Sequence, residues 1–129
     1  MVADTSLEIL MRLDKKVDDF IDKSINNFVK WEILRFLHKH HDNFLDVNDL
    51  VEKIKRSEEQ IISEITSMCQ QGIISRKNED GKDYYSYKLS SDDNKELEMK
   101  SLVNKLIDIC KTRRGRLQMI YKLLKTNNS

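Results

Sequence analysis

Two short amphipathic segments separated by a tight turn constrain the fold of this chain more than any other feature. In each segment the apolar residues recur at spacings of three and four, which is the spacing of one helix face. These residues are Val47, Leu50, Val51 and Ile54 in the first segment and Ile61, Ile65, Met68 and Cys69 in the second. The connection runs from Ile54 to Ser57. The pattern predicts two helices joined by a tight turn.

The sequence also marks where these two helices begin and end. Asp46 can cap the helix that ends near Ile54, because its carboxylate can accept from a first-turn amide. The segment 57–60, Ser-Glu-Glu-Gln, has the form of a capping box that opens the second helix. Gly72 follows that helix, and glycine is favoured there because it takes a left-handed conformation at no steric cost.

After Gly72 the apolar period changes from that of a helix to that of a strand. Polarity alternates on both sides of the pair Asp80-Gly81, which is a strong hairpin turn signal because glycine accepts a positive φ. The residues that define the alternation are Ile74 and Arg76 before the turn and Tyr85, Tyr87 and Leu89 after it. A hairpin directly after two such helices is typical of a winged helix-turn-helix, a module that most often binds DNA.

Further helices are predicted on both sides of this module. Thr5 to Glu8 has the form of a capping box and opens a predicted helix from about Ser6 to Ser24, with an apolar stripe that continues toward Phe28. A second, broadly apolar helix is predicted from Phe28 to His40. A last helical segment begins at residues 90–93, and Gly115 is expected to kink it or divide it into two helices.

The apolar stripes on these flanking helices are larger than a small module can bury. They comprise Leu7, Leu10, Val17 and Ile21 near the N-terminus, and Leu97, Leu102, Leu106, Ile109, Leu117, Ile120 and Leu124 near the C-terminus. The predicted organisation is an N-terminal dimerisation helix over 1–27, a winged helix-turn-helix domain over 28–90 and one or two C-terminal dimerisation helices over 91–129. The fold class is mainly α with a two-stranded β-wing, in a homodimer.

Composition limits the class of protein without selecting a function. A chain of 129 residues can bury one real core, and a formal charge of +1 gives it no global attraction to nucleic acid or membranes. No apolar run approaches the roughly 20 residues of a membrane span, and the N-terminus lacks a signal-peptide pattern. We expect a cytoplasmic protein without membrane contact.

Cys69 and Cys110 are too few for a disulfide framework. They are expected to be small buried residues, with redox sensing as the alternative.

From about Phe28 to Ser90 the sequence resembles the winged helix-turn-helix of bacterial and archaeal transcriptional regulators, and the whole plan is similar to the MarR family. The resemblance rests on Leu50, Val51 and Ile54, on residues 57–76 through Gly72-Ile73-Ile74-Ser75-Arg76, and on Asp80-Gly81-Lys82 with Leu89-Ser90. It implies intertwined flanking helices in a homodimer and a second helix that enters the DNA major groove. The expected partners also include a small-molecule effector of unassigned chemistry.

The second helix of the motif departs from the usual pattern of a DNA reader. It carries Glu58, Glu59 and Glu64 and no Lys or Arg, a local charge of −3. First-turn carboxylates also have a structural explanation, because they interact favourably with the helix dipole. The groups expected to reach base edges are Gln60, Ser63 and Thr66, and the cations expected to meet phosphates just before the helix are Lys55 and Arg56.

The predicted wing carries the remaining candidate DNA contacts. Arg76, Lys77 and Lys82 bracket its tip and are expected to contact phosphates or the minor groove; the alternative is that they are solvated charges balanced by neighbouring acids. We expect Tyr85 and Tyr87 to pack the wing onto the helices and Tyr84 to be partly exposed.

Other clusters give weaker signals. The most basic stretch is Lys111 to Arg116, which could meet DNA, an acidic protein or solvent. His38, His40 and His41 lack partners at metal-ligand spacing, so no metal or cofactor is expected, and no motif indicates an enzyme. The sequence thus predicts a transcriptional regulator that binds double-stranded DNA as a homodimer. The alternative is a winged-helix protein-protein interaction module that does not read DNA.

Overall fold

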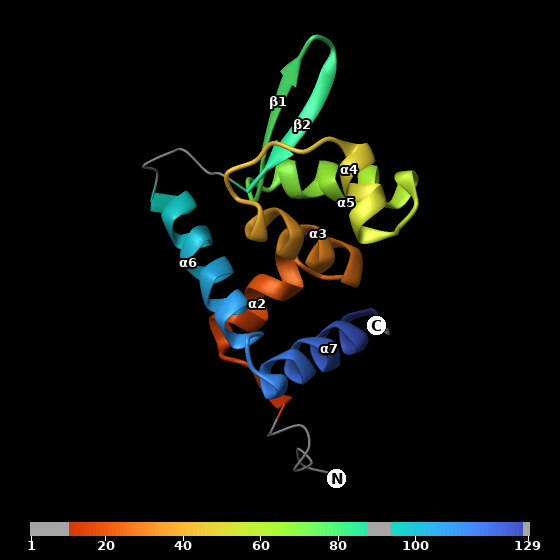
Figure 1. Ribbon diagram of the computed structural model, residues 1–129. Coiled ribbons are helices and arrows are strands. Elements are labelled where there is room, and N and C mark those ends of the chain that lie inside the picture. Colours follow the sequence, from red (N-terminus) through yellow and green to blue (C-terminus); the bar gives the residue numbers. More distant parts are fainter. Residues whose placement is uncertain (1–10, 88–93, 128–129) are drawn as a thin grey trace. The chain divides into compact units, whose positions relative to one another are not determined.

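The computed structural model describes residues 11–87 and 94–127, and these residues form a mainly helical fold with one two-stranded antiparallel sheet (Figure 1). The helices are α2 (Lys15–Ser24), α3 (Phe28–Lys39), α4 (Val47–Ile54), α5 (Glu58–Gln70), α6 (Asn94–Ile109) and α7 (Arg113–Asn127), and the strands are β1 (Ser75–Glu79) and β2 (Lys82–Ser86). The mainly α class with a two-stranded sheet is therefore confirmed. No helix within the described ranges is long and apolar enough to cross a membrane.

The chain divides into two compact units. One unit is Phe28–Lys100, and the other combines Met1–Asn27 with Ser101–Ser129. Below they are called the central unit and the terminal unit, and α6 runs from the first into the second. Each has its own buried apolar residues.

The central unit contains α3, α4, α5 and the hairpin, which extends away from the three helices (Figure 1). Its core is formed by residues that the helical and strand periods placed inward. The fully buried ones are Ile33, Leu34, Leu37, Leu50, Ile61, Ile65, Met68 and Ile73. The predicted helix over 28–40 is confirmed to within one residue, because α3 ends at Lys39.

Local turn chemistry accounts for the end of α5 and for the hairpin. Gly72 has φ +78°, and its amide donates to the Cys69 carbonyl while the next amide, of Ile73, donates to that of Met68, which is a Schellman ending. In the hairpin, Glu79 pairs with Lys82 across a two-residue loop. Both loop residues, Asp80 and Gly81, have positive φ, as a type I′ turn requires. The predicted turn is confirmed.

The N-terminal helix predicted over 6–24 is wrong in its continuity. Met11 is helical, but residues 12–14 are not, and α2 begins at Lys15. Leu13 is nearly buried, and the Asp14 carboxylate accepts from Lys105 Nζ at 2.6 Å. These tertiary contacts favour a break over one more turn of helix. The predicted capping box at Thr5 to Glu8 lies outside the described residues, as do Leu7, Leu10, Leu89 and residues 90–93.

The predicted interruption of the C-terminal helix is present, but it lies before Gly115. Helix α6 ends at Ile109 and α7 starts at Arg113, so Gly115 is in the first turn of α7. The Thr112 hydroxyl accepts from the Gly115 amide at 3.0 Å and donates to the Ile109 carbonyl at 3.2 Å. A Cβ at position 115 would lie 1.6 Å from the Ile109 carbonyl oxygen. Glycine is required here for close approach of the two helices, not for a hinge.

The predicted C-terminal apolar stripe is only partly buried. Leu106 is buried, whereas Leu97, Leu117, Ile120 and Leu124 are 45 to 52% exposed. The residues that α7 does bury, Met119 and Leu123, were not in the predicted stripe. Because α7 carries apolar residues on two sides, the sequence period could not identify the inward face.

The two cysteines are free and lie in different units. Both are half-buried, and burial raises the pKa of the Cys69 thiol above its usual value. A raised pKa lowers the fraction of reactive thiolate. The expectation that these residues are buried is thus met in part.

Candidate nucleic-acid interface

Helices α4 and α5 each begin with a capping box. The Asp46 carboxylate accepts from the Asp49 amide at 2.9 Å, and the Asp49 carboxylate accepts from the Asp46 amide at 3.2 Å. At the next helix the Ser57 hydroxyl accepts from the Gln60 amide, and the Gln60 side-chain oxygen accepts from the Ser57 amide. Both predicted caps are confirmed. Between the helices Lys55 is exposed in a left-handed conformation with φ +62°.

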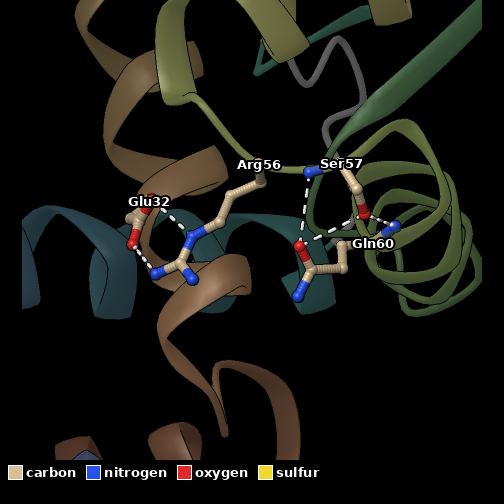
Figure 2. Close-up of polar contacts among 4 residues, drawn as sticks. All are labelled: Glu32, Arg56, Ser57 and Gln60. Carbon is tan, nitrogen blue, oxygen red and sulfur yellow. Dashed lines mark hydrogen bonds and ion pairs between the residues drawn. The ribbon is translucent and has the colours of Figure 1, made fainter.

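Arg56, the second predicted phosphate contact in the turn, is turned toward α3. Its guanidinium donates to both carboxylate oxygens of Glu32, at 2.6 and 3.3 Å (Figure 2). The hydrogen bonds with Glu32 raise the pKa of Arg56. A bidentate pair of this kind holds the side chain in one orientation. Arg56 can therefore reach a phosphate only by leaving or sharing Glu32.

The outer face of α5 is polar, with one apolar residue. Ile61, Ile65 and Met68 are buried against the unit, while the opposite side is exposed. The exposed residues are Glu58, Glu59, Gln60, Ile62, Ser63, Thr66 and Gln70.

The three predicted base-reading groups differ in availability. Ser63 is exposed, and the Thr66 hydroxyl, also exposed, donates to the Ile62 carbonyl at 2.7 Å. Gln60 is exposed, but its side-chain oxygen belongs to the capping box. Ser63 is therefore better placed than Gln60 to approach a base edge, and Thr66 can approach one as an acceptor.

Glu64 belongs to the interior of the unit and not to this outer face. Its carboxylate lies 3.2 Å from Lys30 Nζ, and the two side chains are 22% and 9% exposed. Glu64 therefore does not share the exposed outer face of α5 with Glu58 and Glu59. Lys30 balances its charge from α3, a non-local pairing that no spacing within α5 could reveal.

The hairpin carries the predicted wing cations on its two paired strands. Arg76 and Lys77 are exposed and lie across the strands from Tyr85 and Tyr84. Lys77 Nζ is 4.2 Å from the centre of the Phe44 ring and 3.4 Å from a Glu79 oxygen. A lysine over an aromatic ring keeps its charge while its position is restricted.

Lys82, the third predicted wing cation, is paired with the N-cap residue of α4. Its ammonium lies 2.8 Å from the Asp46 carboxylate, and its side chain is still 51% exposed. The Lys82 hydrogen bond lowers the pKa of Asp46, and the same bond raises the pKa of Lys82. The Asp46 carboxylate therefore both caps α4 and forms an ion pair with the hairpin.

The sequence did not reveal how the hairpin is attached to the helices. Leu45, just before α4, forms an isolated antiparallel bridge with Tyr85, with both amide-to-carbonyl distances at 2.8 Å. Tyr85 and Tyr87 are buried and Tyr84 is half-buried, as predicted. Burial raises the pKa of Tyr87 to about 12, and its ring is 5.0 Å from that of His38.

The remaining histidines and the acidic cluster have protein partners. The rings of Phe36 and His40 are 4.6 Å apart, and His41 lies 3.5 Å from Asp42. Asp18, Asp19 and Asp22 bring their oxygens within 4.8 Å of one another. Lys122 donates to the first and last of them, so this cluster is accounted for by an ion pair.

Charge is divided unequally between the two units. The central unit contains 12 Lys or Arg and 15 Asp or Glu, a net charge of −3, whereas the terminal unit has a net charge of +4. In the basic stretch 111–116, Arg116 donates to the carbonyls of Cys110 and Lys111 and so stabilises the end of α6. Lys111 pairs with Asp108 at 2.9 Å.

Comparisons with known proteins add no relative to these observations. No protein-family model, no curated protein and no solved structure matches the chain.

Proposed function

We propose that the central unit is a winged helix-turn-helix that binds duplex DNA and that the chain is a transcriptional regulator similar in plan to the MarR family. The observation that carries the proposal is the hairpin, which the Leu45–Tyr85 bridge attaches to the segment just before α4, the first helix of the proposed helix-turn-helix. It carries the exposed cations Arg76, Lys77 and Lys82, and it follows in sequence a helix whose outer face is polar. That combination suits phosphate contact by the wing and base contact by Ser63 and Thr66.

Replacing Arg76, Lys77 and Lys82 together with Ala tests this proposal. If all three contact phosphates, affinity should fall for every duplex alike, and the slope of log K against log salt should flatten by about 0.9 for each phosphate that is no longer neutralised. Anisotropy titrations of a labelled duplex across a range of salt measure both quantities. The matched control replaces Arg35, Lys39 and Lys53, which are exposed on the helices of the same unit. A folded wing variant with unchanged affinity and slope contradicts a role for the wing.

The proposed regulator acts as a homodimer, and α7 supplies the supporting observation. Leu117, Ile120 and Leu124 are 46, 45 and 50% exposed, and their spacing of three and four places them on one side of the helix. Apolar side chains gathered in this way favour burial against a partner.

Replacing these three residues with Gln should convert a dimer into a monomer. Sedimentation equilibrium should give twice the 15.3 kDa chain mass for the parent and the chain mass for the variant. The control is Ile62→Gln, which removes an apolar residue of similar exposure (43%) from α5. A parent mass of 15.3 kDa at all concentrations excludes the dimer.

A second candidate function is binding of a basic protein by the outer face of α5. It is favoured by the exposure of Ile62 beside Glu58 and Glu59, by the net charge of −3 and by the pairing of Arg56 and Lys82 with acids of their own unit. The DNA titration separates the two functions, because an acidic protein-binding face predicts no duplex binding even at about 50 mM salt.

A further inference from the structure

The ion pair between Arg56 and Glu32 engages a cation at the start of the helix proposed to read DNA. Arg56 directly precedes Ser57, the N-cap residue of α5. In helix-turn-helix proteins the N-terminal residues of the second helix contact the bases, so we expect the duplex backbone to pass close to Arg56. Glu32 reaches the same arginine from α3 (Figure 2).

The Glu32 carboxylate occupies donors that a phosphate would use. Arg56 Nη2 and Nε donate to its two oxygens at 2.6 and 3.3 Å. A guanidinium binds carboxylate and phosphate with the same bidentate geometry, so the two anions compete for this edge of Arg56. A phosphate at the other edge would lie beside the Glu32 carboxylate, and the two negative charges would repel each other.

The Arg56–Glu32 pair is accessible to an incoming anion. The two side chains are 37% and 29% exposed, and an ion pair with such exposure contributes little to folding stability. Glu32 also lies inside α3 and can be removed without loss of a helix cap. The pair of Lys82 with Asp46 differs in this respect, because Asp46 caps α4.

We propose that Glu32 competes with DNA phosphate for Arg56 and thereby limits the affinity of the chain for duplex DNA. This inference rests on the proposed function, because it concerns the affinity of the same interface. Lys55, Arg76 and Lys77 are exposed and contact phosphate in the parent chain, whereas Arg56 does so only after Glu32 is removed or displaced.

The test is a double-mutant cycle of Glu32→Ala and Arg56→Gln in the full chain. Binding of a labelled mixed-sequence duplex is measured by anisotropy between about 50 and 200 mM salt. Glu32→Ala should strengthen binding and steepen the slope of log K against log salt by about 0.9, because Arg56 then neutralises one further phosphate. This change in slope makes the gain in affinity about three- to fourfold larger at the lower salt than at the higher.

Two comparisons separate the release of Arg56 from the loss of one negative charge. Glu52→Ala removes the same side chain from an exposed position in α4 and should keep the parental slope. Arg56→Gln alone should also keep that slope, and Glu32→Ala added to Arg56→Gln should have no larger effect than Glu52→Ala. Circular dichroism verifies that each variant is folded.

The outcomes distinguish this inference from the proposed function. A steeper slope for Glu32→Ala that requires Arg56 supports the competition. A folded Glu32→Ala protein with the slope of Glu52→Ala overturns it, while duplex binding by the parent leaves the proposed function in place. A flatter slope for Arg56→Gln alone also overturns it, because Arg56 would then contact phosphate in the parent. Absence of duplex binding by the parent and by every variant overturns both.

Discussion

Gly115→Ala is expected to destabilise the terminal unit by about 3 kcal/mol. The reason is steric, because the new Cβ would lie 1.6 Å from the Ile109 carbonyl oxygen and 2.5 Å from its carbon. Both atoms belong to the backbone at the end of α6, so no side-chain rotation relieves the overlap. Urea unfolding followed by far-UV circular dichroism should show loss of helix at a clearly lower urea concentration.

Gly72→Ala is the matched comparison for this result. Gly72 has φ +78° and open space around its Cβ position, so alanine there should cost only the left-handed strain of about 1 to 2 kcal/mol. A Gly115→Ala protein as stable as the parent would contradict the close contact between the start of α7 and the end of α6.

Glu64→Gln is expected to lower the free energy of unfolding by about 2 kcal/mol. Lys30, with a side chain 9% exposed, would lose a charged partner 3.2 Å away. A buried charge that loses its partner is costly because the desolvation penalty is no longer offset. Trp31, which is buried in the same helix as Lys30, provides a fluorescence signal for the denaturant titration.

Glu59→Gln serves as the control because it makes the same chemical change on the same helix at an exposed position. We expect it to change stability by less than about 0.5 kcal/mol. Equal stabilities of the two variants would show that the Lys30–Glu64 pair does not hold α3 to α5. The substitution at Glu64 therefore tests stability. The acidity of the outer face of α5 comes from Glu58 and Glu59 instead.

The features that could be predicted from sequence are those determined by neighbouring residues. The caps at Asp46 and Ser57 and the turn at Asp80-Gly81 depend on groups within four positions of each other. The spacing of apolar residues identified the buried face of α5 because its other face is polar. These local rules gave the central unit its element order, and they placed Ser63, Thr66 and Arg76 at exposed positions.

The features that could not be predicted depend on which segments meet in three dimensions. Arg56 was expected to meet phosphate because nothing near it in sequence reveals Glu32, which lies 24 residues earlier. Lys30 and Glu64 pair across two helices in the same way. The break before α2 depends on Asp14 and Lys105, which are 91 residues apart.

Duplex DNA binding by the parent chain is the most direct test of the account, because the proposed function rests on phosphate contact by the wing. The measurement is an anisotropy titration of a labelled mixed-sequence duplex at about 50 mM salt, repeated at about 200 mM. We predict saturable binding at the lower salt that weakens steeply at the higher salt, in proportion to the number of phosphates contacted. Absence of binding at the lower salt would contradict the account and would favour a protein partner for the acidic face of α5.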